Sequence, residues 1–279
     1  MRDVILYSRE RSPIALVFAL AALLYSSGLQ IRPSPFAYLS GLASMFLFLF
    51  LIRLSDDICD VPIDKITHPE RLLSRGALSL PALNRFRVVA VLCLLLLQVR
   101  HYPVFIYTGV VVVLFSVFFC FKPKLPTLLH VALLNSSLVV FPIFAGLAAR
   151  SSITTFEILM GLFFWAGGFA HDLSHSLLDT RNVDPQKLNP INKLNQAALA
   201  KLSLLAFLVS GGFGMLLYQR RLVGDGFFIC LVIMILTMLG LEWKLIRQPS
   251  EKNAKPFYTF GFIYFLAPAA CQMFAALFP

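Results

Sequence analysis

Residues 36–71 read FAYLSGLASMFLFLFLIRLSDDICDVPIDKITHPER, an apolar run that leads directly into a cluster of acids. Arg53 is the one charged residue between positions 36 and 55. A transmembrane helix needs about 20 mostly apolar residues, and this run has that length. A surface helix of a soluble protein would instead carry a regular polar face. The stretch therefore predicts a membrane-spanning helix whose end carries carboxylates.

The composition of the whole chain agrees with this prediction. The chain has 279 residues, of which 58% are hydrophobic and 14% are charged. Soluble domains carry about 25% charged and 45–50% apolar residues. The composition excludes a soluble domain, a disordered chain, a disulfide scaffold and a coiled coil, and the long apolar runs do not show the alternation of a β-barrel. We expect one all-α polytopic membrane domain over residues 1–279.

Nine stretches of the chain are long and apolar enough to cross a bilayer. The expected fold is therefore a bundle of nine transmembrane helices. The expected spans are 13–31, 36–55, 82–100, 103–121, 127–149, 153–172, 197–218, 223–243 and 257–277.

Positive charge is distributed unequally between the two sides of these spans. The chain has 24 Lys and Arg residues, and all but five flank one side. Because cytoplasmic loops are enriched in Lys and Arg, the N-terminus is expected inside and the C-terminus outside. The same bias accounts for the net charge of +10 without a nucleic-acid partner. We expect a multi-pass protein of the bacterial inner membrane, with its acidic clusters on the cytoplasmic side.

The first acidic cluster follows the second span. Asp57, Asp60 and Asp64 have helical i, i+3 and i+7 spacing, which places them on one face, with Asp56 beside them. Like charges at these spacings repel each other, so a cation is expected among them. Mg²⁺ binds through carboxylate oxygens and commonly takes one or two carboxylates plus substrate phosphates.

Two further features of this stretch favour a diphosphate ligand. Pro62 is expected to kink or end the helix and to turn Asp64 towards the site. Arg71 follows, and a guanidinium is suited to phosphate oxygens. The alternative is an ordinary solvated loop with many charges.

At these residues the chain resembles the UbiA superfamily of intramembrane prenyltransferases. The pattern Asp56-Asp57-x-x-Asp60-x-x-x-Asp64, followed by His68-Pro69-Glu70-Arg71 and Gly76, is similar to the first motif of that family. Asp56 replaces the usual asparagine, and Arg75 replaces the usual serine. The match suggests a short, divergent branch. It implies that Asp57, Asp60 and Asp64 are catalytic, with Asp56, Asp57 and Asp60 as ligands of a Mg²⁺ cofactor.

A second cluster ends the sixth span and is only partly similar to the family's second motif, D-x-x-D-x-x-x-D. Asp172 and Asp179 keep the outer acids, and the resemblance makes them metal ligands, but His175 replaces the middle one. Imidazole is a poor ligand for Mg²⁺. We therefore expect His175 to contact a phosphate oxygen.

The resemblance also implies an activity. Arg71, Lys122 and His175 are expected to bind the diphosphate of a prenyl lipid embedded in the bilayer. Mg²⁺-dependent ionisation would be followed by transfer of the prenyl group to an acceptor that the sequence does not identify.

Other functions remain open at this stage. Because the second cluster is degenerate, the chain could be a non-catalytic relative that binds a lipid diphosphate. A cation quenched within the substrate would make it a terpene cyclase. The letters His171-Asp172-x-x-His175 are also similar to the zinc motif of intramembrane metalloproteases.

Two polar features inside the spans receive simpler interpretations. The five cysteines are an odd number without CxxC spacing and are expected to be packing residues. Asn135 lies within an apolar span and is expected to hydrogen-bond to another helix.

Overall fold

The computed structural model describes residues 2–179, 196–248 and 250–278, without the side chains of 127, 176–179, 196–197 and 251. All regular elements within these ranges are helices. Their contacts divide the chain into two compact units. Unit 1 consists of Met1–Tyr25, Pro33–Leu125 and Leu147–Ser151, and unit 2 of Ser26–Arg32, Pro126–Gly146 and Ser152–Pro279.

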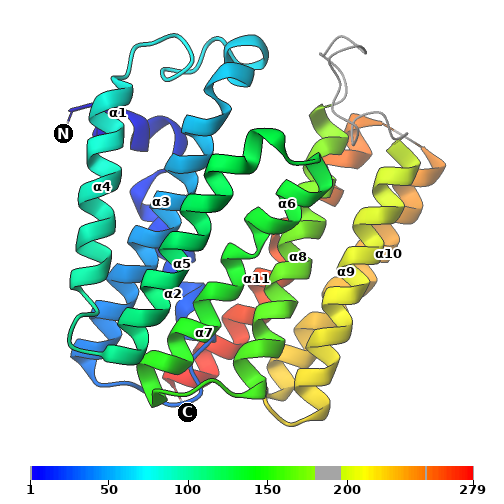
Figure 1. Ribbon diagram of the computed structural model, residues 1–279. Helices are drawn as coiled ribbons and strands as arrows, with labels where there is room; N and C mark the ends of the chain where they lie inside the picture. Colours follow the sequence, from blue (N-terminus) through cyan, green and yellow to red (C-terminus); the bar gives the residue numbers. More distant parts are fainter. Residues whose placement is uncertain (1, 180–195, 249, 279) are drawn as a thin grey trace. The chain divides into compact units, whose positions relative to one another are not determined.

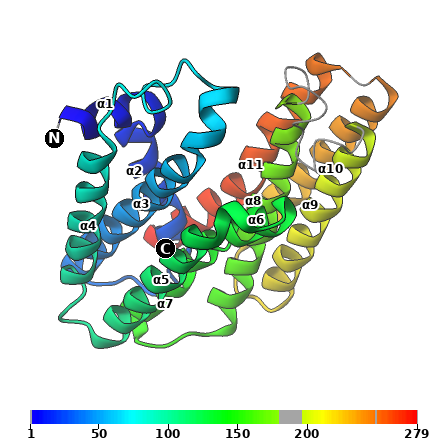
Figure 2. The same cartoon turned by 45° about the horizontal axis from the view of Figure 1, so that its top comes forward.

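Unit 1 is built around the long helix that carries the first acidic cluster (Figure 1). That helix, α3, packs against α4 and α5, and α4 also contacts α1 (Figure 2). Ser34 and Ser79 cap the starts of α3 and α4, because each hydroxyl accepts a hydrogen bond from the amide three residues on. The elements are α1 (Arg2–Arg11), α2 (Ile14–Ser27), α3 (Pro35–Thr67), α4 (Leu80–Leu96), α5 (Tyr102–Phe121) and the 3₁₀ turn η1 (Lys122–Lys124).

Helix α3 runs through Pro62 and ends at Thr67, so of the two expected effects of Pro62, a kink or an end, the end is wrong. A proline inside a helix removes one backbone hydrogen bond, and α3 tolerates this loss close to its end. All four acids therefore lie on one continuous helix of 33 residues. Beyond it the chain turns at Gly76, whose φ of 74° lies in the left-handed region that favours glycine.

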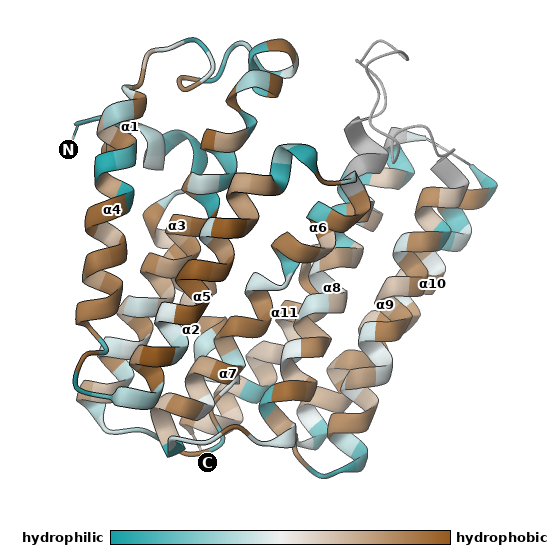
Figure 3. Ribbon diagram, in the orientation of Figure 1, coloured by the Kyte–Doolittle hydropathy of each residue, from teal (hydrophilic) through white to brown (hydrophobic). Residues whose placement is uncertain are grey.

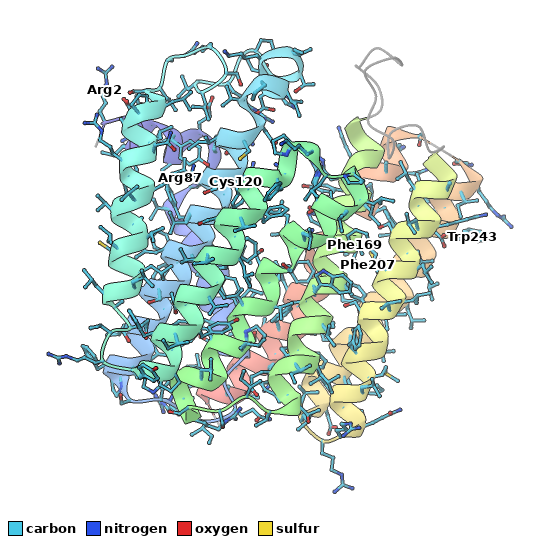
Figure 4. The ribbon with its side chains drawn as sticks, viewed as in Figure 1. Arg2, Arg87, Cys120, Phe169, Phe207 and Trp243 are labelled. Carbon is cyan, nitrogen blue, oxygen red and sulfur yellow. The ribbon has the colours of Figure 1, made fainter. Side chains whose placement is uncertain are left out.

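Unit 2 contains helices that cross at close range through small and polar residues. Helix α8 packs against α6, α9 and α11, and α10 packs against α9 and α11. The Ser203 and Ser210 hydroxyls donate to carbonyls of α8 at 2.7 and 2.8 Å, as is common between membrane helices. Phe207, labelled in Figure 4, packs its ring against Tyr264. The elements are α6 (Thr127–Asn135), α7 (Ser137–Arg150), α8 (Thr155–Asp179), α9 (Gln196–Gln219), α10 (Asp225–Arg247) and α11 (Glu251–Leu277).

Six helices of the described chain are long and apolar enough to cross a membrane, and Figure 3 shows the hydrophobic residues along them. They confirm an integral membrane protein, while the nine-span count and the orientation stay predictions. Helices α2 and α4 are shorter, with 14 and 17 residues. The six are Pro35–Thr67, Tyr102–Lys124, Leu128–Arg150, Ala198–Gln219, Asp225–Arg247 and Lys252–Leu277.

Candidate functional site

The acids of α3 divide into two sets that face different partners. Asp56 and Asp60, one helical turn apart, both accept hydrogen bonds from the Lys122 ammonium, at 2.5 and 2.7 Å. Lys122 is the first residue of η1, directly after α5, and its side chain is only 6% exposed. The chain thus brings the predicted phosphate-binding lysine onto two of the predicted metal ligands.

This arrangement leaves a net negative charge at the end of α3. One buried ammonium neutralises one of the two carboxylates, and the Asp60 side chain remains 33% exposed. Removing one partner of a buried ion group leaves an uncompensated charge, which costs about 3–5 kcal/mol. The Lys122 ammonium therefore holds the cluster together, and the Asp60 carboxylate remains accessible to a second cation.

Asp57 points to a different set of partners. Arg11 Nη2 and Nε donate to its two oxygens at 2.9 and 3.2 Å, and the Tyr7 hydroxyl donates at 2.7 Å. Arg53 lies 3.4 Å from the same carboxylate, whose side chain is 5% exposed. Asp57, Asp60 and Asp64 lie on one continuous helix with the spacing of a common face, and each of them contacts a different cation.

Asp64 pairs with the predicted diphosphate ligand Arg71. Arg71 Nη1 donates to an Asp64 oxygen at 2.6 Å, which ties the loop after α3 back to the helix. In the same loop His68 lies 3.4 Å from the exposed carboxylate of Glu70. All four aspartates of the first motif are thus contacted by Lys or Arg, as expected for a cluster that needs positive charge.

Unit 1 also contains a small apolar cavity. Its volume is about 60 Å³, and it lies among α3, α4 and α5. Ser55, the residue before Asp56, belongs to its lining, and so does Arg87, which is labelled in Figure 4. The remaining lining residues are apolar except for Ser116: Phe48, Leu51, Ile52, Val91, Leu94, Val112, Phe115 and Phe119.

The second motif lies in unit 2. Asn135 Nδ2 donates to Asp172 at 2.6 Å, which confirms the expected hydrogen bond of this asparagine to another helix. His171 stacks on the Tyr258 ring at 4.6 Å, and His175 meets the same ring edge-on at 5.2 Å. The Asp179 side chain lies outside the described residues.

The described residues contain no group of three or more His, Cys, Asp or Glu side chains placed to hold a metal ion. The first motif instead offers carboxylate pairs already bound to cations. All five cysteines are free thiols, so no disulfide constrains either unit.

Sequence reasoning missed Arg11, Tyr7 and Tyr258. In the sequence, Arg11 is one of many Lys and Arg residues on the positively charged side of the spans. Because Arg11 and Asp57 are 46 positions apart, no local spacing links them. For Tyr7 and Arg11, the signal that could have found them is the density of polar and charged residues before the first apolar run.

Known proteins resemble the chain over almost its whole length. The family described as the UbiA prenyltransferase family matches residues 15–266. No curated protein sequence matches the chain.

Solved structures of this kind share the fold at low sequence identity. One is a structure described under the biosynthesis of digeranylgeranylglyceryl phosphate synthase in membranes, with a TM-score of 0.69, 16% identity, and 98% of this chain and 99% of the other covered. A UbiA homologue from Aeropyrum pernix K1 has a TM-score of 0.69, 13% identity and coverage of 89% and 94%. A UbiA homologue from Archaeoglobus fulgidus, bound to DMAPP and Mg²⁺, has a TM-score of 0.61, 13% identity and coverage of 93% and 98%.

Proposed function

Because the chain belongs to the UbiA prenyltransferase family, we propose that it binds a prenyl diphosphate with Mg²⁺ and transfers the prenyl group to an acceptor. The observation that carries this proposal is the Lys122 ammonium between the carboxylates of Asp56 and Asp60. A lysine and paired acids at one helix end are the groups that a metal-bound diphosphate requires.

The residues of the cluster fit Mg²⁺. Asp56 and Asp60 supply oxygen ligands, and Mg²⁺ commonly takes one or two carboxylates together with substrate phosphates. When bound there, the ion would neutralise the leaving diphosphate. The family resemblance adds Asp57, Asp172 and Asp179 as ligands, and those assignments remain predictions.

Cationic side chains of the chain would also stabilise the negative charge of the leaving diphosphate. Lys122 contacts Asp56 and Asp60, and Arg71 contacts Asp64; both cations would turn from a carboxylate to a phosphate oxygen. In the proposed reaction the allylic C–O bond breaks, and its electron pair leaves with the diphosphate. The acceptor then attacks the carbocation and loses a proton. Fixed positive charge at the diphosphate favours the bond-breaking step.

The prenyl tail requires apolar surroundings close to these charges. The cavity lined by Phe48, Phe115 and Phe119 reaches Ser55, but at about 60 Å³ it is too small for a prenyl chain, so the tail would extend into the surrounding lipid. The fulgidus homologue binds DMAPP, a prenyl diphosphate, which supports the substrate class. The charge bias of the sequence supports a cytoplasmic site in a bacterial inner membrane.

A second candidate function is binding of a lipid diphosphate without catalysis. It is favoured by His175, which stands where the family has an acid and packs against Tyr258. A histidine there removes an oxygen ligand from the second motif. The two functions differ in whether the C–O bond breaks.

Release of diphosphate from a panel of prenyl diphosphates of increasing length tests the proposal. The protein is purified in detergent with Mg²⁺, and Asp60→Asn and Lys122→Met are compared with Lys124→Met. Lys124 is the matched control, because it is an exposed lysine of the same turn. Metal-dependent release that both site variants lose and the control keeps supports the enzyme.

The other outcomes identify the alternatives. Release without any acceptor, with a cyclic hydrocarbon as product, indicates a terpene cyclase. Binding without release, even with acceptor pools added, indicates the lipid-diphosphate-binding protein. If the protein neither binds prenyl diphosphates nor releases diphosphate from them, the proposed function is overturned.

A further inference from the structure

Helix α1 contacts the first motif at points spread over the whole helix. Its residues bond to α3 and to the loop between α3 and α4, which lies beside α1 in Figure 1. Helix α1 is not itself a membrane span, because its ten residues are too few to cross a bilayer.

The end of α1 fixes Asp57. The Arg11 guanidinium forms two hydrogen bonds to the Asp57 carboxylate, and Tyr7 adds a third. Tyr7 is fully buried and belongs to an apolar cluster with Phe50 and Leu54 of α3. A bidentate arginine defines the orientation of a carboxylate as well as stabilising it. Arg11 therefore sets the rotation of the α3 turn that also carries Asp56 and Asp60.

Two acids of α1 fix the loop that follows α3. Both Glu10 oxygens accept from the Leu72 amide, at 3.0 and 3.2 Å, and Asp3 accepts from the Ser79 amide at 3.2 Å. Leu72 directly follows Arg71. The main chain on the C-terminal side of Arg71 is thus held by a side chain of α1.

We propose that Arg11 and Glu10 are positioning residues of the diphosphate site, an inference that rests on the proposed function. Arg11 acts through Asp57 on the turn of α3 that presents Asp56 and Asp60. Glu10 acts through the Leu72 amide on the loop that presents Arg71. Neither residue needs to touch the substrate, and together they make α1 a part of the site.

The Glu10 contact is tested with two measurements on the full chain in detergent. Hydrogen exchange reports how well residues 68–79 are held, and calorimetry reports the affinity for pyrophosphate in the presence of Mg²⁺. We expect Glu10→Ala to raise exchange in this loop and to weaken binding about three- to tenfold. Glu10→Gln keeps an acceptor oxygen and should rescue much of both effects. Arg9→Ala, an exposed neighbour on the same helix, is the matched control and should change neither.

The Arg11 contact is tested in the same assay. Arg11→Gln should weaken pyrophosphate binding about tenfold or more, and Arg11→Lys, which keeps the charge without the two-pronged contact, should lie between it and the wild type. If Arg11→Gln does not fold, Arg11→Lys and the Glu10 series decide the result. Faster loop exchange with unchanged affinity would overturn the inference, because α1 would then be structural only.

Failure of the proposed function looks different. If wild-type protein does not bind magnesium pyrophosphate, the proposed function fails, and the positioning roles fail with it. If wild type binds and Lys122→Met does not, while Glu10→Ala and Arg11→Lys both bind normally, the site is correct and only the inference about α1 is overturned.

Discussion

At the scale of single residues, the Lys122 ammonium occupies the position between Asp56 and Asp60 where a metal cation is expected. Lys122→Met therefore leaves two carboxylates facing each other without compensation. We expect the variant to lose about 3–5 kcal/mol of stability. We also expect Mg²⁺ alone to raise its unfolding temperature more than that of the wild type, because the ion can then neutralise the pair. Thermal unfolding in detergent with and without Mg²⁺ measures both effects.

Lys124→Met is the control for this prediction, since it removes an exposed lysine from the same turn. An equal response of the two variants to Mg²⁺ would mean that Asp56 and Asp60 do not bind the ion.

Tyr7 makes a second prediction at this scale. Burial and the neighbouring Asp57 carboxylate raise the pKa of the Tyr7 hydroxyl far above its ordinary value of 10, so it donates throughout the physiological range. A raised pKa contributes stability below pH 10 that is lost only as the pH rises through the folded-state value. Tyr7→Phe keeps the ring and removes the donor, which should cost about 1.5–3 kcal/mol at pH 7. Chemical or thermal unfolding measures the stability of Tyr7→Phe, and Tyr102→Phe, a change at an exposed tyrosine, is the control. Equal stabilities of the two variants would contradict the prediction.

The residue types of the first motif were predictable, but their pairing was not. Helical spacing grouped Asp57 with Asp60 and Asp64, because spacing along one helix is all that a sequence window shows. In the structure each of them contacts a cation from a different segment: Arg11, Lys122 and Arg71. Partners that lie far away in the chain cannot be deduced from local periodicity.

At the scale of helices, the contact of α6 with α8 depends on Gly168, which has no side chain. A Cβ built at Gly168 would collide with Leu138 and with the amide oxygen of Asn135, the residue that bonds to Asp172. Gly168→Ala should therefore destabilise the protein by about 1–3 kcal/mol, as overpacking typically does. Gly212→Ala, where no atom lies within 4 Å, should be neutral or slightly stabilising because alanine favours a helix. Unfolding temperatures of the two variants measure the difference, and a reversed order would refute the contact.

Apolar length predicted where most helices lie, but not where they bend or begin. The expected span 127–149 divides into α6 and α7 at Ser136, although its hydropathy is continuous. Conversely, α3 continues past Pro62, where a kink or an end was expected. Helix α1 escaped prediction because it is polar and short, and because its stability comes from tertiary contacts.

At the scale of the molecule, the fold survives with few shared residues. Structures with 13–16% identity match the chain with TM-scores of 0.61–0.69. A bundle of apolar helices needs helix lengths, small residues at crossings and satisfied backbone groups, and many sequences meet these needs. The chemistry depends on far fewer positions, which is why the acidic motifs identified the family while the apolar spans indicated only a membrane bundle.

The orientation of the whole chain is the last prediction. All but five of the 24 Lys and Arg residues flank one side of the expected spans, so the loop near Ser250 should face the cytoplasm and the turn near Arg221 the opposite side. Single cysteines at these two positions, in a variant without the native five, can be labelled with a membrane-impermeant maleimide on intact spheroplasts. We expect the cysteine at position 221 to be labelled on intact spheroplasts. The cysteine at position 250 should be labelled only after lysis. The reverse pattern would turn the end of α3 away from the cytoplasm, and the Asp56–Asp60–Lys122 cluster would then have no access to cytoplasmic prenyl diphosphates.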